Sequence, residues 1–332
     1  MADWPEQSVH ICVSSPPYWG LRNFNIPPRT WPDGSICSFG SEPTLDLYVQ
    51  HSVVVLRAIW RVLRDDGTCW WNLGDKYFSG GGLRPKDLVM IPARVALAAQ
   101  ADGWYLRSQI IWVKPNPMPE GAKDRPTSSY DLIYLLTKKS KYYFDVEAVK
   151  EEYIENGVGS GKFGRNIRNV WTIPTERFKG AHFATFPARL VKPCIKSGTS
   201  EYGVCAECGS QWKRIIEKSD DKIIISRQGA NAHNAGKIDG FSHYDNEETA
   251  IDVKGAKMNI ESGLVYEYKT LGWQPSCKCN AAVVPAIVCD PFMGSGTTAI
   301  VARRLGRYYL GCELNPDYVK IAENRLIQEM LI

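Results

Sequence analysis

The chain has 332 residues, of which 44% are hydrophobic and 23% are charged, a composition that excludes a disordered chain, a collagen and an all-helical rod. Forty Lys and Arg against 36 Asp and Glu give a net charge of +4, so a surface that binds a polyanion must be local. Ten cysteines are too few for a disulfide scaffold. The start shows no secretory signal, and no apolar run reaches the length of a bilayer span. We therefore expect a cytoplasmic protein without a membrane anchor.

The first 190 residues alternate strand-like and helix-like runs, which predicts an α/β sheet with helices on its faces. We expect Thr44 to cap a helix that runs to about Leu63 and is ended by Asp65, Asp66 and Gly67. The same alternation resumes near the C-terminus, where Pro316 suits the first turn of the last helix. Strands are expected at 9–14, 68–73, 105–113, 132–137, 286–290 and 308–312, and helices at 45–63, 91–101, 297–305 and 316–330.

Residues 196–282 differ in character, because Gly, Ser, Asn, Asp and Lys dominate them. The chain is therefore predicted to hold one domain, 1–195 and 283–332, interrupted by an insertion at 196–282. The insertion carries two close cysteine pairs, Cys205 with Cys208 and Cys277 with Cys279. Four thiolates in two pairs suit tetrahedral zinc, although the second pair has one intervening residue where two to four are typical. The alternatives are Cys194 as a substitute ligand, or a set of small buried thiols without metal.

Positive charge is concentrated before the insertion. Residues 160–196 hold eight Lys and Arg against a single acid, Glu176, a surplus of +7 that could face the phosphates of a nucleic acid. The alternative is a solvated charged surface. The insertion and the loop 19–41, with Arg22, Arg29 and Trp31, are further candidates for reading a nucleic-acid sequence.

A glycine turn follows the strand predicted at 286–290. Gly294 and Gly296 would let a ligand approach the backbone at the start of a helix, where free N–H groups bind anionic groups. Glu313 lies 23 positions after Asp290, at the end of the next strand, where such folds bind the hydroxyls of an adenosine ribose. The spacing is not that of a nicotinamide or flavin site. The alternative is a tight turn without a ligand.

Ser15-Pro16-Pro17-Tyr18 directly follows the first strand, at the carboxyl edge where α/β sheets place their sites. The prolines fix the backbone and leave carbonyl groups free to accept hydrogen bonds. The Ser15 hydroxyl and the Pro16 carbonyl can accept the N–H bonds of an exocyclic amino group, while Tyr18 stacks on the base. The alternative is a proline-stiffened turn.

Together, Ser15-Pro16-Pro17-Tyr18 and the later run from Asp290 to Gly296 resemble the catalytic and cofactor motifs of the β-group of DNA amino-methyltransferases. In that group the target-base half precedes the cofactor half, as it does here. The resemblance covers about 9–195 and 283–330. It extends to Asp66-Gly67-Thr68, to Asn72-Leu73-Gly74-Asp75, and to the segments 111–116, 125–127 and 181–187.

The resemblance implies an α/β, Rossmann-like, doubly wound methyltransferase fold with permuted motif order and a small zinc-ribbon-like insertion. It implies that the base swings out of double-stranded DNA and that its amino nitrogen attacks the methyl group of S-adenosylmethionine (AdoMet) directly. No cysteine nucleophile is then needed. Because Ser at the first motif position usually accompanies cytosine-N4 methylation and Asp usually accompanies adenine-N6 methylation, Ser15 favours cytosine, with adenine as the alternative.

The resemblance also implies the roles of individual residues. Relatives commonly carry a Gly-Asp pair on an earlier strand; this chain has none before Ser15, so either the start is late or another residue contacts the adenine. The expected catalytic residues are Ser15, Pro16, Pro17 and Tyr18. The expected AdoMet residues are Asp290, Phe292, Gly294, Ser295, Gly296, Thr297, Glu313, His182 and Phe186. The expected DNA contacts are Arg22, Lys162, Arg165, Arg168 and Lys179, and the expected zinc ligands are Cys205, Cys208, Cys277 and Cys279.

Other functions remain open on the sequence alone. The same chemistry could act on RNA or a protein amide, and a zinc-containing DNA-binding protein with impaired catalysis is a different class. The expected partners are double-stranded DNA, a second copy in a homodimer and a cognate restriction endonuclease, in a bacterial, archaeal or phage-encoded protein.

Overall fold

The computed structural model describes residues 1–21, 26–78, 84–155, 158–176, 186–224 and 264–329. Its contacts divide the chain into two units: unit 1 contains 1–151, 166–214 and 272–332, and unit 2 contains 152–165 and 215–271. These boundaries differ from the predicted insertion, because both cysteine pairs belong to unit 1. In the described part of the chain, no helix is both long and apolar enough to cross a membrane.

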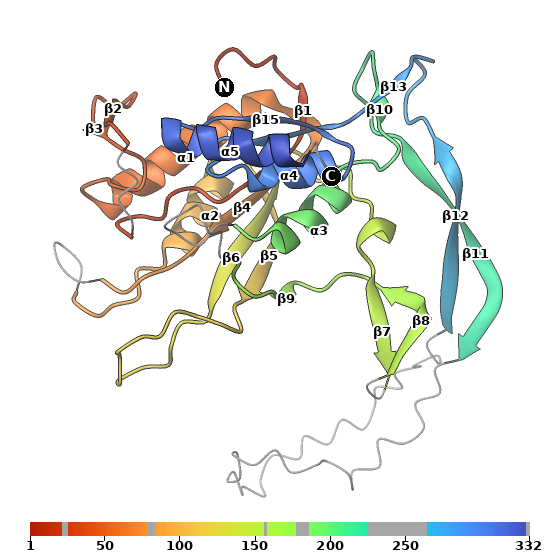
Figure 1. Cartoon of the computed structure of the whole chain (residues 1–332), viewed down its shortest axis with the longest axis horizontal. Helices are drawn as coiled ribbons and strands as arrows, with labels where there is room; N and C mark the ends of the chain where they lie inside the picture. Colours follow the sequence, from red (N-terminus) through yellow and green to blue (C-terminus); the bar gives the residue numbers. More distant parts are fainter. Residues whose placement is uncertain (22–25, 79–83, 156–157, 177–185, 225–263, 330–332) are drawn as a thin grey trace, which may run out of the picture. The chain divides into compact units, whose positions relative to one another are not determined.

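Unit 1 is built on a seven-stranded mixed sheet (Figure 1). In the order given below, the first four strands run parallel to one another, and the fifth, β6 (Tyr130–Thr137), is antiparallel to both of its neighbours. This arrangement confirms the predicted α/β class, and the strands expected at 9–14 and 105–113 have the predicted bounds. In sheet order the strands are β15 (Tyr308–Gly311), β14 (Ile287–Asp290), β1 (Val9–Ser14), β4 (Leu63–Leu73), β6 (Tyr130–Thr137), β5 (Tyr105–Val113) and β9 (Val170–Thr172).

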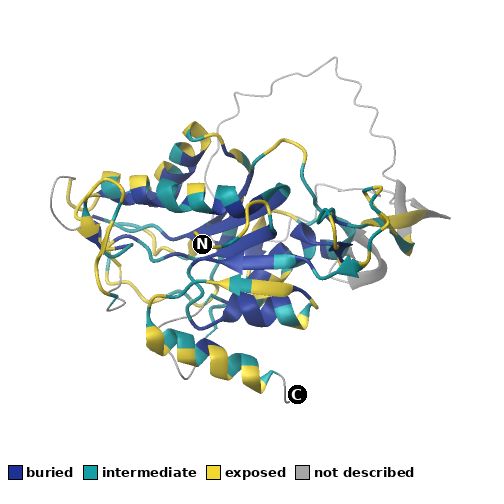
Figure 2. Ribbon diagram, turned by 90° about the horizontal axis from the view of Figure 1, so that it is seen from above, coloured by how far each residue is buried: buried dark blue, intermediate teal, exposed yellow. Residues whose placement is uncertain are grey.

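Helices cover both faces of this sheet. Because alternate residues of a strand face opposite sides, Cys12 joins a core with α1 (Leu45–Val62) and α2 (Ile91–Ala101). Ile11 and Val13 join a second core with α3 (Ala188–Gly198) and α4 (Thr297–Arg304). Figure 2 shows the central strands as buried, with the exposed residues on the outer faces of the helices. The helices are α1 (Leu45–Val62), α2 (Ile91–Ala101), α3 (Ala188–Gly198), α4 (Thr297–Arg304) and α5 (Pro316–Gln328), with a 3-10 turn η1 at Glu147–Val149.

Two predictions about these elements need correction. The first helix ends at Val62, within one residue of its predicted end at about Leu63, but the strand expected at 68–73 begins earlier, because Leu63 already pairs with Val9 as the buried start of β4. Helix α3 was not predicted. Its basic residues and Pro193 weaken the helical pattern, yet its apolar side chains are buried in the second core, which stabilises the helix through tertiary packing.

Four pairs of short or isolated strands complete the described structure. Unit 1 contains β2 (Arg29–Thr30) paired with β3 (Ile36–Cys37), and β10 (Val204–Cys205) paired with β13 (Val283–Val284). The strands that belong mainly to unit 2 are β7 (Glu151–Glu155) paired with β8 (Val158–Arg165), and β11 (Lys213–Ile224) paired with β12 (Leu264–Gln274).

Candidate active site

The two predicted motifs meet at the carboxyl edge of the sheet. Strands β1 and β14 are parallel neighbours, so the segment that follows Ser14 and the turn that follows Asp290 leave the sheet side by side. The Ser14 hydroxyl donates a hydrogen bond of 2.6 Å to Oδ1 of Asp290. Residues 276 positions apart are thereby linked at the place where doubly wound sheets bind ligands.

The Asp290 carboxylate faces the protein interior and organises the glycine turn. Thr298 Oγ1 donates to its Oδ2 over 2.8 Å, and the backbone N–H of Phe292 donates to Oδ1 over 2.9 Å. Burial raises the pKa of Asp290 to about 6, because desolvation opposes ionisation more strongly than these hydrogen bonds favour it. Asp290 was predicted as a cofactor residue, and its contacts suit a role in shaping the cofactor turn.

Glycine is required at both positions of the turn. Gly294 and Gly296 have φ angles of +53° and +82°, which side chains rarely adopt. A Cβ on Gly296 would lie 2.9 Å from the Cβ of Ala322 in α5, so this glycine also permits close helix packing. A Cβ on Gly294 would meet only the Phe292 carbonyl oxygen, at 3.8 Å, so the backbone here is open to a ligand.

Glu313 follows β15 and bonds to the same turn. Its Oε2 accepts the N–H of Gly294 over 2.8 Å, and its Oε1 accepts the N–H of Asn315 over 2.8 Å. An ionised carboxylate has about four acceptor positions, so two hydroxyl groups of a ligand can still donate to it. The structure thus brings Glu313 to the glycine turn, as the sequence predicted.

Three more residues of the predicted cofactor set lie on or beside the glycine turn, one among aromatic rings and two buried. The Phe292 ring lies 5.1 Å from the Phe39 ring and 6.0 Å edge-on from Trp71, between centroids. Ser295 and Thr297 are buried, and Arg325 Nη1 donates to the Ser295 hydroxyl over 2.9 Å. The Ser295 hydroxyl therefore accepts a hydrogen bond from α5.

The tetrapeptide predicted to be catalytic, Ser15-Pro16-Pro17-Tyr18, is held by Asn72 of the neighbouring strand β4. The Asn72 side-chain amide donates to the Ser15 hydroxyl over 3.0 Å and to the Tyr18 hydroxyl over 2.7 Å. Both Nδ2 hydrogens are thus used, and Ser15 keeps a second lone pair for another donor. Asn72 itself is 1% exposed, and its Oδ1 has no hydrogen-bond partner among the described residues.

The Tyr18 ring is fixed at its hydroxyl and along one edge. Its hydroxyl donates to Asp131 over 3.3 Å, and Asp131 is ion-paired with Lys114 at 2.5 Å. Burial and the Asp131 charge raise the pKa of Tyr18 well above its usual value, so the phenol stays protonated. A Cβ on Gly74 would lie 2.5 Å from the ring, so glycine is required beside it.

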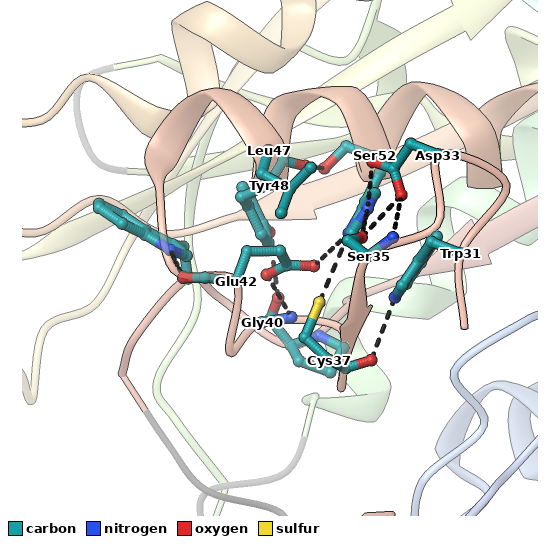
Figure 3. A network of polar contacts seen from close by, with 12 residues as sticks. Trp31, Asp33, Ser35, Cys37, Gly40, Glu42, Leu47, Tyr48 and Ser52 are labelled. Atoms are coloured by element: carbon teal, nitrogen blue, oxygen red, sulfur yellow. Dashed lines mark hydrogen bonds and ion pairs between the residues drawn. The ribbon is translucent and has the colours of Figure 1, made fainter. Parts of the chain in front are cut away.

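A second polar network contacts the backbone beside the Ser15–Tyr18 tetrapeptide (Figure 3). Glu42 and His51 are both buried, with 3.1 Å between Glu42 Oε1 and His51 Nδ1, and the other ring nitrogen faces Asp33 at 3.3 Å. Glu42 Oε2 accepts the N–H of Gly40 over 2.9 Å, and the position of a Gly40 Cβ lies 2.8 Å from Pro17. The Glu42–His51–Asp33 network therefore supports the catalytic loop through Gly40.

Cys37, Glu42 and His51 also lie close enough to share a metal ion. The hydrogen bonds of this group account for it without one, since each nitrogen of His51 already faces a carboxylate. Trp31 stacks on the same ring, with 3.8 Å between centroids. We therefore assign this group a structural role.

The four predicted zinc ligands do come together. The Sγ atoms of Cys205, Cys208, Cys277 and Cys279 all lie within 4.8 Å of one another. Zn–S bonds of about 2.3 Å in a tetrahedron place sulfurs roughly 3.8 Å apart, so the residues present fit the ion. Cys194, the possible substitute, is buried in the second core.

This four-cysteine group packs against the amino ends of the central strands. His10, near the start of β1, lies 3.0 Å from the Gly209 carbonyl oxygen, and Arg64, near the start of β4, donates to the Cys208 carbonyl over 2.7 Å. Because β1 and β4 are parallel, the group lies at the opposite end of these strands from Ser15.

The predicted DNA contacts and the far wall of the cofactor site are only partly described. Arg168 is 62% exposed and forms an ion pair of 2.9 Å with Glu151, so its charge is partly compensated. Phe186 is half-buried and packs against the second core. Lys162 and Arg165 lie on β8 of unit 2. Arg22, Lys179 and His182 lie outside the described residues.

Several functional residues were missed by the sequence reasoning. Asn72 and Lys114 belong to segments of the family resemblance for which the sequence indicated no role, whereas Asp131, Glu42 and His51 carried no local signal. Tyr18 and Asp131 are 113 positions apart, and the pairing of β1 with β4 and of β4 with β6 brings them together. A polar residue among the apolar residues that precede it in the strand was a further sign for Asn72.

Comparisons with known proteins agree with this arrangement. A family described as DNA methylase, which groups N6 and N4 methyltransferases, matches residues 9–208 and 284–324. The type II methyltransferase M.Cfr9I of Citrobacter freundii is 35% identical over 345 residues, covering 97% of this chain and 82% of the relative.

Solved structures show the same fold. The PvuII DNA methyltransferase, named as cytosine-N4-specific, matches with a TM-score of 0.58 and 16% identity over 98% of this chain and 81% of its own. A putative DNA modification methylase from Thermus thermophilus, solved with S-adenosyl-L-methionine, gives 0.52 and 19% identity over 99% and 89%.

Proposed function

Because this chain belongs to the N6/N4 family of DNA methyltransferases, we propose that it transfers a methyl group from AdoMet to the N4 amino group of cytosine in double-stranded DNA. The observation that carries the choice of base is Ser15, a neutral hydroxyl at the first position of the catalytic tetrapeptide. Its partner Asn72 donates to it and leaves one lone pair for the amino group. The cytosine-N4 specificity in the name of the PvuII enzyme supports the same choice.

The residues of this chain would act mainly by positioning. The Ser15 hydroxyl and the Pro16 carbonyl accept the two N–H bonds of an extruded cytosine, so that the nitrogen lone pair is directed at the methyl group. Tyr18 stacks on the base, with its ring held by Gly74 and Asp131. The C–N bond forms as the C–S bond breaks, and the amino group then loses a proton.

On the cofactor side, the glycine turn and Glu313 form the proposed AdoMet pocket. AdoMet, when bound, supplies the electrophilic methyl group. Glu313 would accept the ribose hydroxyls, and Gly294 would let the ligand reach the backbone. Phe292 supplies an apolar surface beside Phe39. The structure solved with AdoMet in a protein of this fold supports the proposal.

One experiment tests the reaction and its alternatives. Purified protein is incubated with methyl-labelled AdoMet and a mixture of DNA, RNA and protein acceptors, and the labelled product is digested and identified. We expect N4-methylcytosine. Label in N6-methyladenine would transfer the proposal to adenine, and label in RNA or protein would change the acceptor. DNA binding without transfer would favour the impaired zinc-containing DNA-binding protein.

Two variants separate the halves of the site. Ser15→Ala should lower transfer while AdoMet binding, measured by calorimetry, stays unchanged. Gly294→Trp should abolish AdoMet binding, because its side chain would fill the opening of the turn. Transfer at the wild-type rate in Ser15→Ala would contradict the role of the hydroxyl.

We also propose a structural zinc ion on Cys205, Cys208, Cys277 and Cys279. Zinc there would join two segments separated by 68 residues and would stabilise the Cys208-Gly209 backbone that His10 and Arg64 contact. Mass spectrometry of the intact protein should find one zinc per chain. Cys208→Ser should lose the ion and lower the melting temperature, whereas Cys194→Ser should keep the ion.

The proposed nucleic-acid contacts extend beyond the catalytic tetrapeptide. Residues 160–196 are proposed to contact phosphates, and residues 196–282 remain a candidate for target recognition or dimer formation. Because the matching relatives are type II methyltransferases, we propose a cognate restriction endonuclease as the functional partner. Arg165→Ala combined with Arg168→Ala should weaken DNA binding and reduce its salt dependence. Unchanged binding at every salt concentration would contradict this.

A further inference from the structure

A cavity of about 410 Å³ lies beside the catalytic tetrapeptide, within the size range of small-molecule sites. Its walls include Leu21, three residues after Tyr18, and the segment Asp75-Lys76-Tyr77, which directly follows Gly74. Because Gly74 touches the Tyr18 ring, the cavity borders the place proposed for the target base. The lining also includes Glu120 and Arg125.

Arg125 is held in a fixed orientation in this wall. Its guanidinium carbon lies 3.5 Å from the centre of the Tyr77 ring, so the flat group stacks on an aromatic surface. Its Nη1 donates to Glu120 over 2.6 Å and to the Pro126 carbonyl over 3.1 Å. Among the residues that the structure describes, these are its hydrogen bonds, so the edge formed by Nε and Nη2 is left for a ligand.

The charges of the cavity indicate which ligand this edge would bind. Asp75 and Glu120 balance Lys76 and Arg125, so the lining has no excess of positive charge. A phosphate site would need such an excess. An uncharged, planar group with two neighbouring acceptors suits a stacked guanidinium fork, and the O6 and N7 atoms of guanine form that pair.

We propose that this cavity binds a guanine of the DNA next to the target base, and that Arg125 reads it through Nε and Nη2. The inference deepens the proposed function and rests on it. Tyr77 and Glu120 are positioning residues, since they fix the plane of the guanidinium and occupy its third nitrogen. Arg125 is then a determinant of sequence specificity.

The test removes the N7 acceptor of guanine and the guanidinium fork of Arg125 in separate experiments. The methylated sequence is identified from DNA modified by the wild-type protein, and each of its guanines is replaced singly by 7-deazaguanine, which lacks N7. We expect one replacement to lower the kcat/KM of the wild type by about 5- to 150-fold. In Arg125→Lys, which keeps the charge but lacks the fork, that penalty should disappear while AdoMet affinity stays unchanged.

Matched variants complete the design. Arg84→Lys should behave as the wild type on every duplex, because Arg84 is 88% exposed and paired with Asp87 outside the cavity. Glu120→Gln should reduce the same penalty, since it loosens Arg125 without removing the fork. A methylated sequence without guanine, or a penalty that survives in Arg125→Lys, would overturn the inference.

Two further results are decisive. An equal loss on all duplexes in Arg125→Lys, with a smaller salt dependence, would identify a phosphate contact and overturn guanine reading. A wild-type protein that methylates no DNA would overturn the proposed function itself, an outcome distinct from the failure of Arg125 to discriminate.

Discussion

Ser14 and Asp290 join the two halves of the site through one buried hydrogen bond of 2.6 Å. Ser14 is the last residue of β1 and directly precedes the catalytic tetrapeptide, while Asp290 ends β14 and begins the cofactor turn. A methyl transfer needs the acceptor nitrogen and the methyl carbon in line, and small displacements are costly. We therefore propose that this bond sets the distance between the two substrates and stabilises the sheet edge.

Replacing Ser14 by Ala tests this link. The variant leaves the buried Asp290 carboxylate short of one donor, so we expect the free energy of unfolding to fall by about 1–3 kcal/mol. AdoMet affinity should fall as well, because the turn loses a support. Urea unfolding and calorimetry measure the two effects. Ser8→Ala is the control, since the exposed Ser8 hydroxyl bonds, among the described residues, only to the Pro5 carbonyl. Wild-type values for Ser14→Ala would refute the link.

Asn72 provides a second test, this time of catalysis. Asn72→Ala removes the donor shared by Ser15 and Tyr18, so both hydroxyls lose their fixed orientation. We expect kcat to fall by about 10- to 100-fold, which corresponds to about 1.4–2.7 kcal/mol in the activation barrier, with AdoMet affinity unchanged. Asn169→Ala should have no such effect, because in the described structure this exposed amide donates only to the Gln109 carbonyl. Equal losses in kcat and AdoMet affinity would indicate a general disturbance of the fold.

Parts of the site could be predicted from the sequence where their residues are close along the chain, and could not be predicted where their contacts join distant segments. The tetrapeptide, the glycine turn, Glu313 and the four cysteines were found because each is a local pattern with a known chemistry. The contacts of Asn72, Asp131 and His51 could not be found, since strand pairing and helix packing create them. The order of elements was predictable for the same reason, whereas α3, with Pro193 inside it, depends on tertiary burial.

The Glu42–His51–Asp33 network predicts a graded effect on stability. Glu42→Ala removes a fully buried carboxylate and leaves the buried His51 without this partner, so we expect a loss of about 3–5 kcal/mol in the free energy of unfolding. Asp33→Ala removes a partner that is 37% exposed, and the expected loss is much smaller, because solvent screens an exposed ion pair. Chemical denaturation gives both values. A larger effect for Asp33 than for Glu42 would reverse the proposed order.

His10 predicts how stability depends on pH. Burial, and secondarily the Arg64 charge, lowers the pKa of His10 from 6.5 to about 4. The neutral ring accepts the Ile287 N–H at Nδ1 over 3.0 Å, so its Nε2–H donates to the Gly209 carbonyl. Protonation of Nδ1 would break the first bond.

Because the pKa of His10 is lower in the folded state, its contribution is complete above pH 6.5 and is lost as the pH falls towards 4. The full loss amounts to roughly 3 kcal/mol, at 1.36 kcal/mol per pH unit. Unfolding free energies of the wild type and His10→Gln, compared between pH 8 and pH 4, isolate this contribution. The difference between the two proteins should shrink steadily with acidification. A constant difference across this range would mean that the pKa of His10 is the same in the folded and unfolded protein, which would contradict the effect of its burial.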